Sequence, residues 1–356
     1  MLIYIINLFV VVLAAFLAKK SKSIFVSRLL LGIAFASMIL VAGLRNRIVG
    51  TDTGYYVRDF NGIRTFADAF DSGNNGGEYG FWILQWFVHL VSNEYLFFLL
   101  AIALIVVGCY QRIIITFSAN IVISFFIFIA MYYTFFFNAA RQGIACAIFA
   151  LAIGPLLDGN FKKYVGYVLL AFLFHSSAIV MLPTFFIVNR TSTFKNSLII
   201  VLVGCVMFFF ADKIIEFAAT YQPRYAIYGE KSMGGGYLSV GFSLANFIFL
   251  YAFKKSVSIE RTRYDCFLNM LLLDILIGLG ATFMGTDPSG LLRISYYLGF
   301  VNMLIWAIVF KNLTTPLSKF VIGYFFVLVH FTYFILATDR FSNLVPYEFN
   351  PFIILR

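Results

Sequence analysis

Apolar segments of membrane-spanning length recur along this whole chain, and they constrain its fold more than any other feature. Runs of roughly 17–25 apolar residues are typical of transmembrane helices, because a helix satisfies its own backbone polar groups within lipid. The composition agrees, with 62% hydrophobic and 12% charged residues, against about 25% charged in soluble domains. We therefore predict an all-α polytopic membrane protein, with residues 1–356 forming a single domain.

The apolar runs predict about 11–12 transmembrane helices, counting one short hairpin. The expected spans lie near residues 2–18, 25–44, 95–111, 120–137, 140–157, 163–175, 176–188, 195–211, 237–253, 265–284, 295–310 and 320–337. The pair 163–175 and 176–188 is too short for two ordinary crossings, so we expect a re-entrant hairpin that turns at His175. Residues 79–92 are apolar but short, which favours an interfacial or half-inserted helix.

The basic residues orient the chain in the membrane. The loop after the first span carries Lys19, Lys20 and Lys22, so the positive-inside rule makes that side cytoplasmic. Alternation of the spans then places both termini and two long loops, 45–78 and 212–236, on the outer face. The net charge of +10 therefore reflects orientation and contact with anionic membrane lipids, and we expect no nucleic acid partner.

Arginines accumulate on this outer face, where basic residues are usually scarce. Arginines at outer span ends or in outer loops include Arg45, Arg47, Arg141, Arg224, Arg293 and Arg340. Snorkelling to the interface explains any one of them, but guanidinium groups also bind phosphate oxygens bidentately. Arg141 and its neighbour Gln142 would point into the bundle, where an ionisable group is functional by default. A converging set of arginines would suit a diphosphate.

Two carboxylates and one histidine are candidates for acid–base chemistry on the same face. For Asp52 three roles are open: a base, a partner that holds one arginine in place, or a solvated loop residue. Glu78 is a second candidate carboxylate. His175 at the expected turn could accept a proton from a hydroxyl as a neutral imidazole. The alternative for His175 is a core histidine bonded to backbone carbonyls.

Aromatic side chains lie close in sequence to two of these arginines. Tyr225 follows Arg224, and Tyr297 lies four residues after Arg293. Their rings could stack on sugars, although tyrosine is common at membrane interfaces in any case. No two histidines have the spacing of metal ligands, and no phosphate-binding loop or nucleophile elbow is present. We therefore expect neither a metal nor another cofactor.

Short motifs follow one another in a recognisable order along the chain. They are Arg45…Gly50-Thr51-Asp52-Thr53…Tyr56, Glu78-Tyr79-Gly80-Phe81, Asn138-Ala139-Ala140-Arg141-Gln142, Phe174-His175-Ser176-Ser177-Ala178 and Arg293-Ile294-Ser295-Tyr296-Tyr297. Together they span most of the chain, and they resemble the motifs of the EpsG-like branch of Wzy-type O-antigen and exopolysaccharide polymerases.

This resemblance implies a glycosyltransferase of the bacterial inner (cytoplasmic) membrane with its active site facing the periplasm. Such enzymes join oligosaccharide repeat units that are carried on undecaprenyl diphosphate. The implied partners are these lipid-linked glycans, together with a flippase and a chain-length-regulating membrane protein. The reaction itself comes from the resemblance, and the placement of the arginines makes it physically coherent.

The expected mechanism needs no metal. An acceptor sugar hydroxyl attacks the anomeric carbon of the donor, and undecaprenyl diphosphate leaves. Preorganised arginines would stabilise the charge that grows on the leaving diphosphate. We expect Arg47, Arg141 and Arg293 in that role, with Arg45 and Arg224 in support. The base would be His175 or Asp52, and Gln142, Glu78, Tyr225 and Tyr297 would bind the substrate.

Three alternatives stay open on the sequence alone. An O-antigen ligase uses the same donor and also needs arginines on the outer face. A flippase for lipid-linked oligosaccharides, or another transporter, predicts internal repeats and charged residues near the midplane, but we find no repeat, and Asp274 is the acidic residue within a span. A non-catalytic scaffold leaves the outer arginines unexplained.

Overall fold

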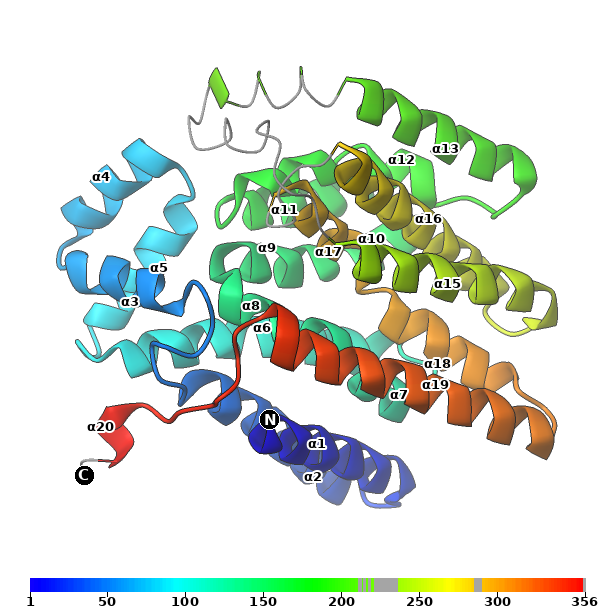
Figure 1. Cartoon of the computed structure of the whole chain (residues 1–356), viewed down its shortest axis with the longest axis horizontal. Helices are drawn as coiled ribbons and strands as arrows, with labels where there is room; N and C mark the ends of the chain where they lie inside the picture. The colour runs from blue at the N-terminus through cyan, green and yellow to red at the C-terminus, as the bar shows by residue number, and fades with distance from the viewer. Residues whose placement is uncertain (211–212, 214–215, 217–218, 221–235, 285–289, 355–356) are drawn as a thin grey trace.

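The computed structural model of the chain is all-α, as the sequence predicts (Figure 1). It describes every residue except 211–212, 214–215, 217–218, 221–235, 285–289 and 355–356. Across the described residues, β-pairing is limited to one isolated bridge between Arg45 and Phe349. The long helices form a bundle, and a smaller group of helices lies at one end of it (Figure 1).

Nine stretches of the described chain are long and apolar enough to cross a bilayer. They are Leu2–Lys20, Ile24–Gly43, Tyr95–Phe117, Ile121–Asn138, Ala140–Leu157, Tyr237–Ser256, Arg261–Phe283, Leu291–Asn312 and Pro316–Arg340. Their helices are α1 (Leu2–Lys20), α2 (Ile24–Gly43), α6 (Tyr95–Phe117), α7 (Ile121–Ile127), α8 (Phe135–Asn138), α9 (Ala140–Ala150), α10 (Ile153–Leu157), α15 (Tyr237–Phe253), α16 (Arg261–Phe283), α17 (Tyr296–Gly299), α18 (Asn302–Asn312) and α19 (Pro316–Leu336). Each stretch corresponds to an expected span.

The three remaining expected spans are shorter helices. The span expected at 163–175 is α11 (Phe161–Phe172). The span expected at 176–188 consists of the 3₁₀ helix η2 (Ser176–Met181) and α12 (Thr184–Val188), and the span expected at 195–211 is α13 (Phe194–Phe209). At about 1.5 Å per residue, α11 and η2 with α12 are too short to cross about 30 Å of hydrocarbon. They form the expected hairpin, which turns at the extended residue His175. Tyr164 joins the two arms through bonds of 2.6 Å to the Met181 carbonyl and the Thr184 hydroxyl.

The long outer loop expected at 45–78 is largely helical. It contains α3 (Thr53–Gly62) and α4 (Phe66–Gly76), which pack with α5 (Tyr79–His89) into a group that we call the α3–α5 lobe (Figure 1). The short helix expected at 79–92 is therefore present as α5. Phe60 is fully buried and stacks between His89, at 3.9 Å, and Phe98 of α6, at 5.0 Å. This apolar face explains why the segment folds as helices rather than as a loop.

Both termini lie at the same end of the bundle as the α3–α5 lobe (Figure 1). The C-terminal segment runs along the end of α2, where the backbone amide of Asn46 donates to the Glu348 backbone carbonyl at 2.8 Å. The Asn350 amide donates to the Leu44 carbonyl, also at 2.8 Å. The Tyr4 hydroxyl of α1 donates to the Leu344 carbonyl at 3.1 Å. We call this end of the molecule the lobe end.

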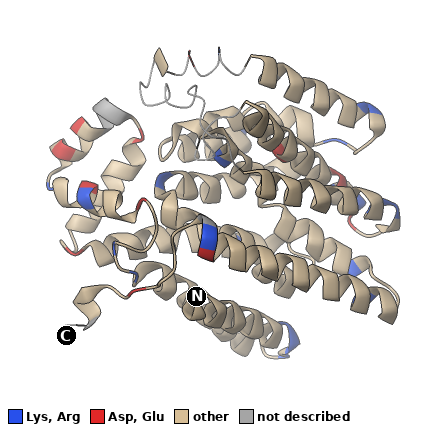
Figure 2. Ribbon diagram, viewed as in Figure 1, with Lys and Arg blue, Asp and Glu red and all other residues tan. Residues whose placement is uncertain are grey.

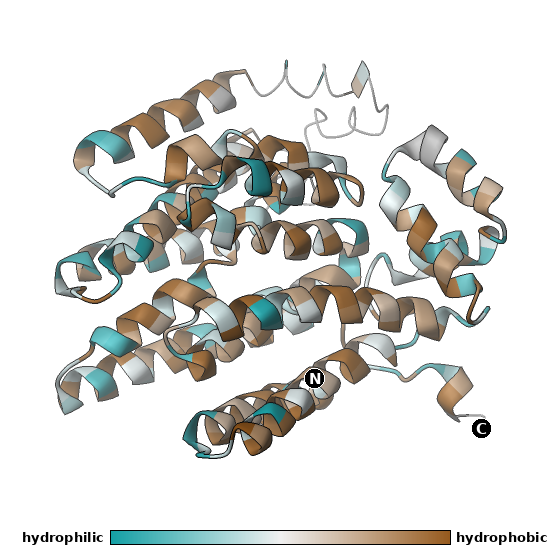
Figure 3. Ribbon diagram, turned by 180° about the vertical axis from the view of Figure 1, so that it is seen from behind, coloured by the Kyte–Doolittle hydropathy of each residue, from teal (hydrophilic) through white to brown (hydrophobic). Residues whose placement is uncertain are grey.

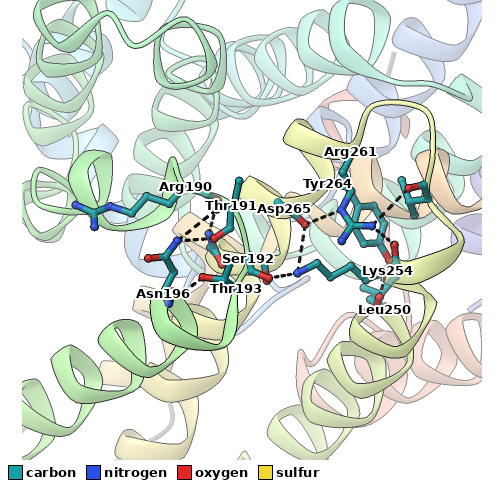
Figure 4. A network of polar contacts seen from close by, with 12 residues as sticks. Arg190, Thr191, Ser192, Thr193, Asn196, Leu250, Lys254, Arg261, Tyr264 and Asp265 are labelled. Carbon is teal, nitrogen blue, oxygen red and sulfur yellow. Dashed lines mark hydrogen bonds and ion pairs between the residues drawn. The ribbon is translucent and has the colours of Figure 1, made fainter.

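The opposite end of the bundle carries the loops that the positive-inside rule assigns to the cytoplasm. Lysine and arginine mark these loops in Figure 2, whereas α3 carries one residue of each sign and α4 only acidic residues. Figure 4 shows how two of the loops are tied together. Lys254 donates to the Ser192 carbonyl and lies 3.6 Å from Asp265, which is 3.2 Å from Arg261. Two basic side chains at this end, Lys254 and Arg261, thus share one acidic partner within the protein.

Hydrophobic residues make up most of the long helices (Figure 3). Large apolar side chains are exposed on α1, α2, α13, α15 and α19, including Phe9, Leu29, Phe209, Ile248 and Phe325. A protein surface in water rarely shows an apolar area of this extent. The bundle is therefore built to face lipid.

Candidate active site

One carboxylate at the lobe end holds together two residues that the sequence singles out. Oε1 of Glu78 lies 2.5 Å from Nδ1 of His175, and Oε2 lies 3.2 Å from Nη1 of Arg141. The Ser176 amide donates to Oε1 at 3.4 Å. The Glu78 side chain is fully shielded from solvent, whereas those of His175 and Arg141 stay 16% and 24% exposed. The guanidinium of Arg141 and the imidazole of His175 are therefore accessible to a ligand, whereas the carboxylate of Glu78 is not.

The backbone brings these residues together where the lobe meets the hairpin. Glu78 has a left-handed φ of 63° just before α5. The Gly80 amide then donates to the Leu173 carbonyl at 2.8 Å. A Cβ at position 80 would lie 3.0 Å from that carbonyl oxygen, so glycine permits this close approach. The start of α5 is thus docked on the hairpin turn that carries His175.

Arg141, in the first turn of α9, faces a second carboxylate and two aromatic rings. Its Nη2 lies 3.8 Å from Oδ2 of Asp59 on α3. Its guanidinium carbon is 5.4 Å from the ring centres of both Phe81 and Trp82, within the range of cation–π attraction. Burial raises the pKa of the Asp59 carboxyl above its ordinary value, and the charge of Arg141 opposes that shift. These contacts fix the orientation of the guanidinium.

A second arginine–carboxylate pair lies beside the first. Nη2 of Arg293 is 3.9 Å from Oδ2 of Asp52. Arg293 belongs to a short 3₁₀ helix, η5 (Leu291–Ser295), and its carbonyl accepts a hydrogen bond of 3.0 Å from the Gln142 side-chain amide. Gln142 is buried and follows Arg141 in α9, so it links the two arginines through the backbone. Of the expected roles for Asp52, the geometry supports that of a partner for an arginine.

The loop that carries Asp52 is fixed by the last two residues of α8. Gly50 has a φ of 99°, in a region that favours glycine. Asn138 accepts a hydrogen bond of 2.9 Å from the Thr51 amide and donates one of 2.6 Å to the Ser342 carbonyl. The Thr53 hydroxyl donates to the Phe137 carbonyl at 3.1 Å. The motifs around residues 50 and 138 therefore form one structural unit.

Two tyrosines line the same region from inside the protein. Tyr297 is fully buried, and its hydroxyl lies 3.1 Å from Oγ of Ser177, so its ring has no exposed face for a sugar in this conformation. The Tyr56 hydroxyl accepts a hydrogen bond of 3.1 Å from the Ala140 amide. Burial, with a smaller effect of the Asp52 charge, raises the pKa of Tyr56 to about 12. Tyr56 therefore keeps its proton at neutral pH.

The other expected site residues lie apart from this cluster. Arg45 is completely buried, with its guanidinium carbon 4.3 Å from the centre of the Phe137 ring and a hydrogen bond to the Ala42 carbonyl. Burial lowers the pKa of Arg45 to about 10, so it remains charged at neutral pH without a surface for a ligand. Arg47 is exposed on the loop before α3. Arg224 and Tyr225, with most of the loop 212–236, lie outside the described residues.

Asp59 and Tyr56 are site residues that the sequence analysis did not select. A usable signal was present, because Asp52, Tyr56 and Asp59 have the i, i+4, i+7 spacing of one helix face. Because a loop was expected at 45–78, the helical spacing of these residues was not considered. In the part of the chain that the structure describes, no three His, Cys, Asp or Glu side chains form a group that could hold a metal ion.

The fold and this cluster define a polytopic membrane protein with paired arginines and a carboxylate–imidazole contact at one end of its bundle. A model of the EpsG family matches residues 28–349, so the chain belongs to the EpsG family. No curated protein and no solved structure matches the chain. Membership of this family supports a polysaccharide polymerase-type role of a glycosyltransferase-like kind, in agreement with the motifs described above.

Proposed function

We propose that this protein polymerises oligosaccharide repeat units that are linked to undecaprenyl diphosphate. The observation that carries this proposal is the position of Glu78 between His175 and Arg141. It puts a candidate base and a candidate phosphate-binding cation on the two oxygens of one buried carboxylate. Transfer of a glycan from a diphosphate to a hydroxyl can use both groups, the base for the acceptor hydroxyl and the cation for the leaving diphosphate.

In the proposed reaction, an acceptor hydroxyl forms a bond to the anomeric carbon of the donor glycan. The bond from that carbon to the diphosphate oxygen breaks, and undecaprenyl diphosphate leaves with the electron pair. Arg141 and Arg293 bind the leaving diphosphate. Their distances of 3.8 Å and 3.9 Å to Asp59 and Asp52 exceed those of short charge-assisted bonds, so phosphate oxygens can compete for the same guanidinium donors.

His175 receives the proton of the acceptor hydroxyl in this proposal. Its Nδ1 faces Glu78, which leaves Nε2 as the atom that takes the proton. A carboxylate on the other ring nitrogen fixes the tautomer and stabilises the imidazolium that forms, as in other acid–base pairs. Glu78 acts through His175 and is a positioning residue.

The proposed location is the bacterial inner membrane, with the lobe end facing the periplasm. The support is the distribution of charge, since the opposite end carries the basic loops that the positive-inside rule assigns to the cytoplasm. A flippase would deliver the lipid-linked units to this face, and a chain-length-regulating membrane protein is a second proposed partner.

Incubation of the purified protein with a lipid-linked repeat unit tests the proposal. We expect a ladder of products that differ by one repeat unit. In cells, loss of the gene should leave single-unit chains attached to the final acceptor. An O-antigen ligase would instead leave no attached glycan, and a transporter would give no ladder. A purified protein that forms no product longer than the supplied unit would contradict the proposal.

The proposed chemistry uses arginines in place of a metal to neutralise the diphosphate. We therefore expect the purified enzyme to form the same ladder in the presence of EDTA as in its absence. If EDTA stopped the reaction and a divalent ion restored it, the arginine-only mechanism would be wrong, while the polymerase function would stand.

A further inference from the structure

An apolar groove of about 360 Å³ lies between α15 and α19, with Trp306 of α18 also lining it. This volume is within the range of roughly 300–1,000 Å³ that ligand pockets occupy. From α15 the walls include Phe242, Ala245 and Phe249. Facing residues of α19 include Val321, Phe325 and Val329. None of its lining residues is a lysine, arginine, aspartate or glutamate.

The groove lies on the lipid-facing side of the bundle. In the spans that contain α15 and α19, only 17% of the apolar stretch is buried within the protein. At the groove floor Trp306 donates to Asn246 at 2.8 Å, and Asn246 donates to Asn302 at 2.6 Å. His330 also lines the groove, with Nδ1 bonded to the Phe326 carbonyl at 2.8 Å and Nε2 buried without a hydrogen-bond partner. Apart from this one buried nitrogen, the surface that the groove presents to an occupant is apolar and rich in aromatic rings.

On the lobe side of the groove lies a small cavity of about 70 Å³, which is lined by both polar and apolar residues. Phe242 stands between the two, with its ring 4.6 Å from that of Tyr333, which lines the cavity. The cavity also contains Asp274 and Ser295, and Ser295 is the last residue of η5, the helix that carries Arg293. The groove thus leads from the middle of α15 and α19 towards the proposed diphosphate site.

We propose that this groove holds the polyprenyl tail of the lipid-linked substrate, an inference that rests on the proposed function. An isoprenoid chain is uncharged, unsaturated and branched, and it suits a groove with aromatic walls that opens to lipid. Arg293 would hold the anionic head at the lobe end.

Filling the groove tests this inference. Ala245→Trp places a large side chain on a groove-lining position, and Leu244→Trp is the matched control, because Leu244 neighbours it on α15 without lining the groove. The probe is undecaprenyl phosphate with a photoreactive group, applied to purified protein in nanodiscs. We expect Ala245→Trp to lower its cross-linking about tenfold, the effect of about 1.4 kcal/mol of lost contacts, and Leu244→Trp to match the wild type.

Substrate kinetics give a second readout. Ala245→Trp should raise KM for an undecaprenyl-linked donor about tenfold, and the defect should shrink for a donor with a two-isoprene tail, which can occupy less of the groove. Equal effects on both donors, or equal labelling of the groove by a photoreactive phospholipid, would overturn the inference. If the wild type forms no ladder, the polymerase proposal fails, while cross-linking still decides whether the groove binds a polyprenyl chain.

Discussion

Glu78 is the residue whose position says most about this site. Its side chain is excluded from solvent and contacts both His175 and Arg141. A buried carboxylate is costly unless charged or hydrogen-bonded partners compensate it. The contacts with His175 and Arg141 compensate the cost of burying the carboxylate, and they also fix the orientations of these two side chains. Because Glu78 lies far from both in sequence, only the folded chain reveals this relationship.

Glu78→Gln should separate a positioning role from a purely structural one. The amide can still accept a bond from Arg141, but its NH₂ group would face Nδ1 of His175 and favour the tautomer with the proton on Nε2. We expect kcat to fall by about 10²–10⁴, the usual contribution of a general base, with KM changed only a few-fold. Unchanged kcat in properly inserted protein would remove Glu78 and His175 from the mechanism.

Arg141→Ala and Arg293→Ala should each prevent polymer growth beyond one repeat unit. Loss of a charge-stabilising donor costs about 10²–10³ in rate, and each arginine is proposed to contact the leaving diphosphate. The measurement is the product ladder, with insertion checked by membrane fractionation. Arg340→Ala is a control, since Arg340 is exposed and pairs with its neighbour Asp339. Long-chain polymer at wild-type levels in both site variants would exclude this site.

At the scale of elements, the site depends on loops that dock the α3–α5 lobe on the bundle. The loop at Gly50 is bonded to Asn138, which is bonded in turn to the C-terminal segment at Ser342. The start of α5 is bonded to the hairpin at Leu173. These contacts determine where Asp52 and Glu78 lie relative to α9. Substitutions in these two segments should therefore alter activity even where the substituted residue does not contact the substrate.

Gly50→Ala should destabilise the lobe end of the molecule. A Cβ at this position would lie 2.5 Å from Oδ1 of Asn138, and the φ of 99° is unfavourable for alanine. Such backbone strain costs about 1–3 kcal/mol. We expect a lower melting temperature in detergent and shorter polymer. Gly62→Ala is the matched control, because a Cβ at position 62 would meet no atom within 4 Å. Equal stability of the two variants would contradict this role of Gly50.

At the scale of the whole molecule, the proposed orientation puts the two ends of the bundle on opposite sides of the membrane. Single cysteines at exposed positions, in a chain with its four native cysteines replaced, should show this with a membrane-impermeant maleimide. We expect Arg58→Cys on α3 to be labelled from outside. Lys20→Cys and Lys255→Cys should react only after the membrane is opened. Labelling of the lysine positions in intact cells would reverse the proposed orientation.

The sequence predicted the helical spans well because each is a local property of composition. A run of apolar residues must form a helix in lipid, wherever it packs. The hairpin at His175 was also predictable, since two short runs flank a polar turn. The segment 45–78 was not, because its helices are short and amphipathic, and polar residues concealed their apolar face.

The chain alone determined that this is a helical membrane protein with arginines gathered on one side, because hydropathy and charge act through composition and position in sequence. It also supplied the motifs that place it in its family. Only the tertiary structure decided which residues meet. Arg45 is buried rather than exposed to a ligand, Asp52 faces Arg293, and Glu78 joins His175 to Arg141. Such pairings depend on contacts between distant segments, which local patterns do not encode.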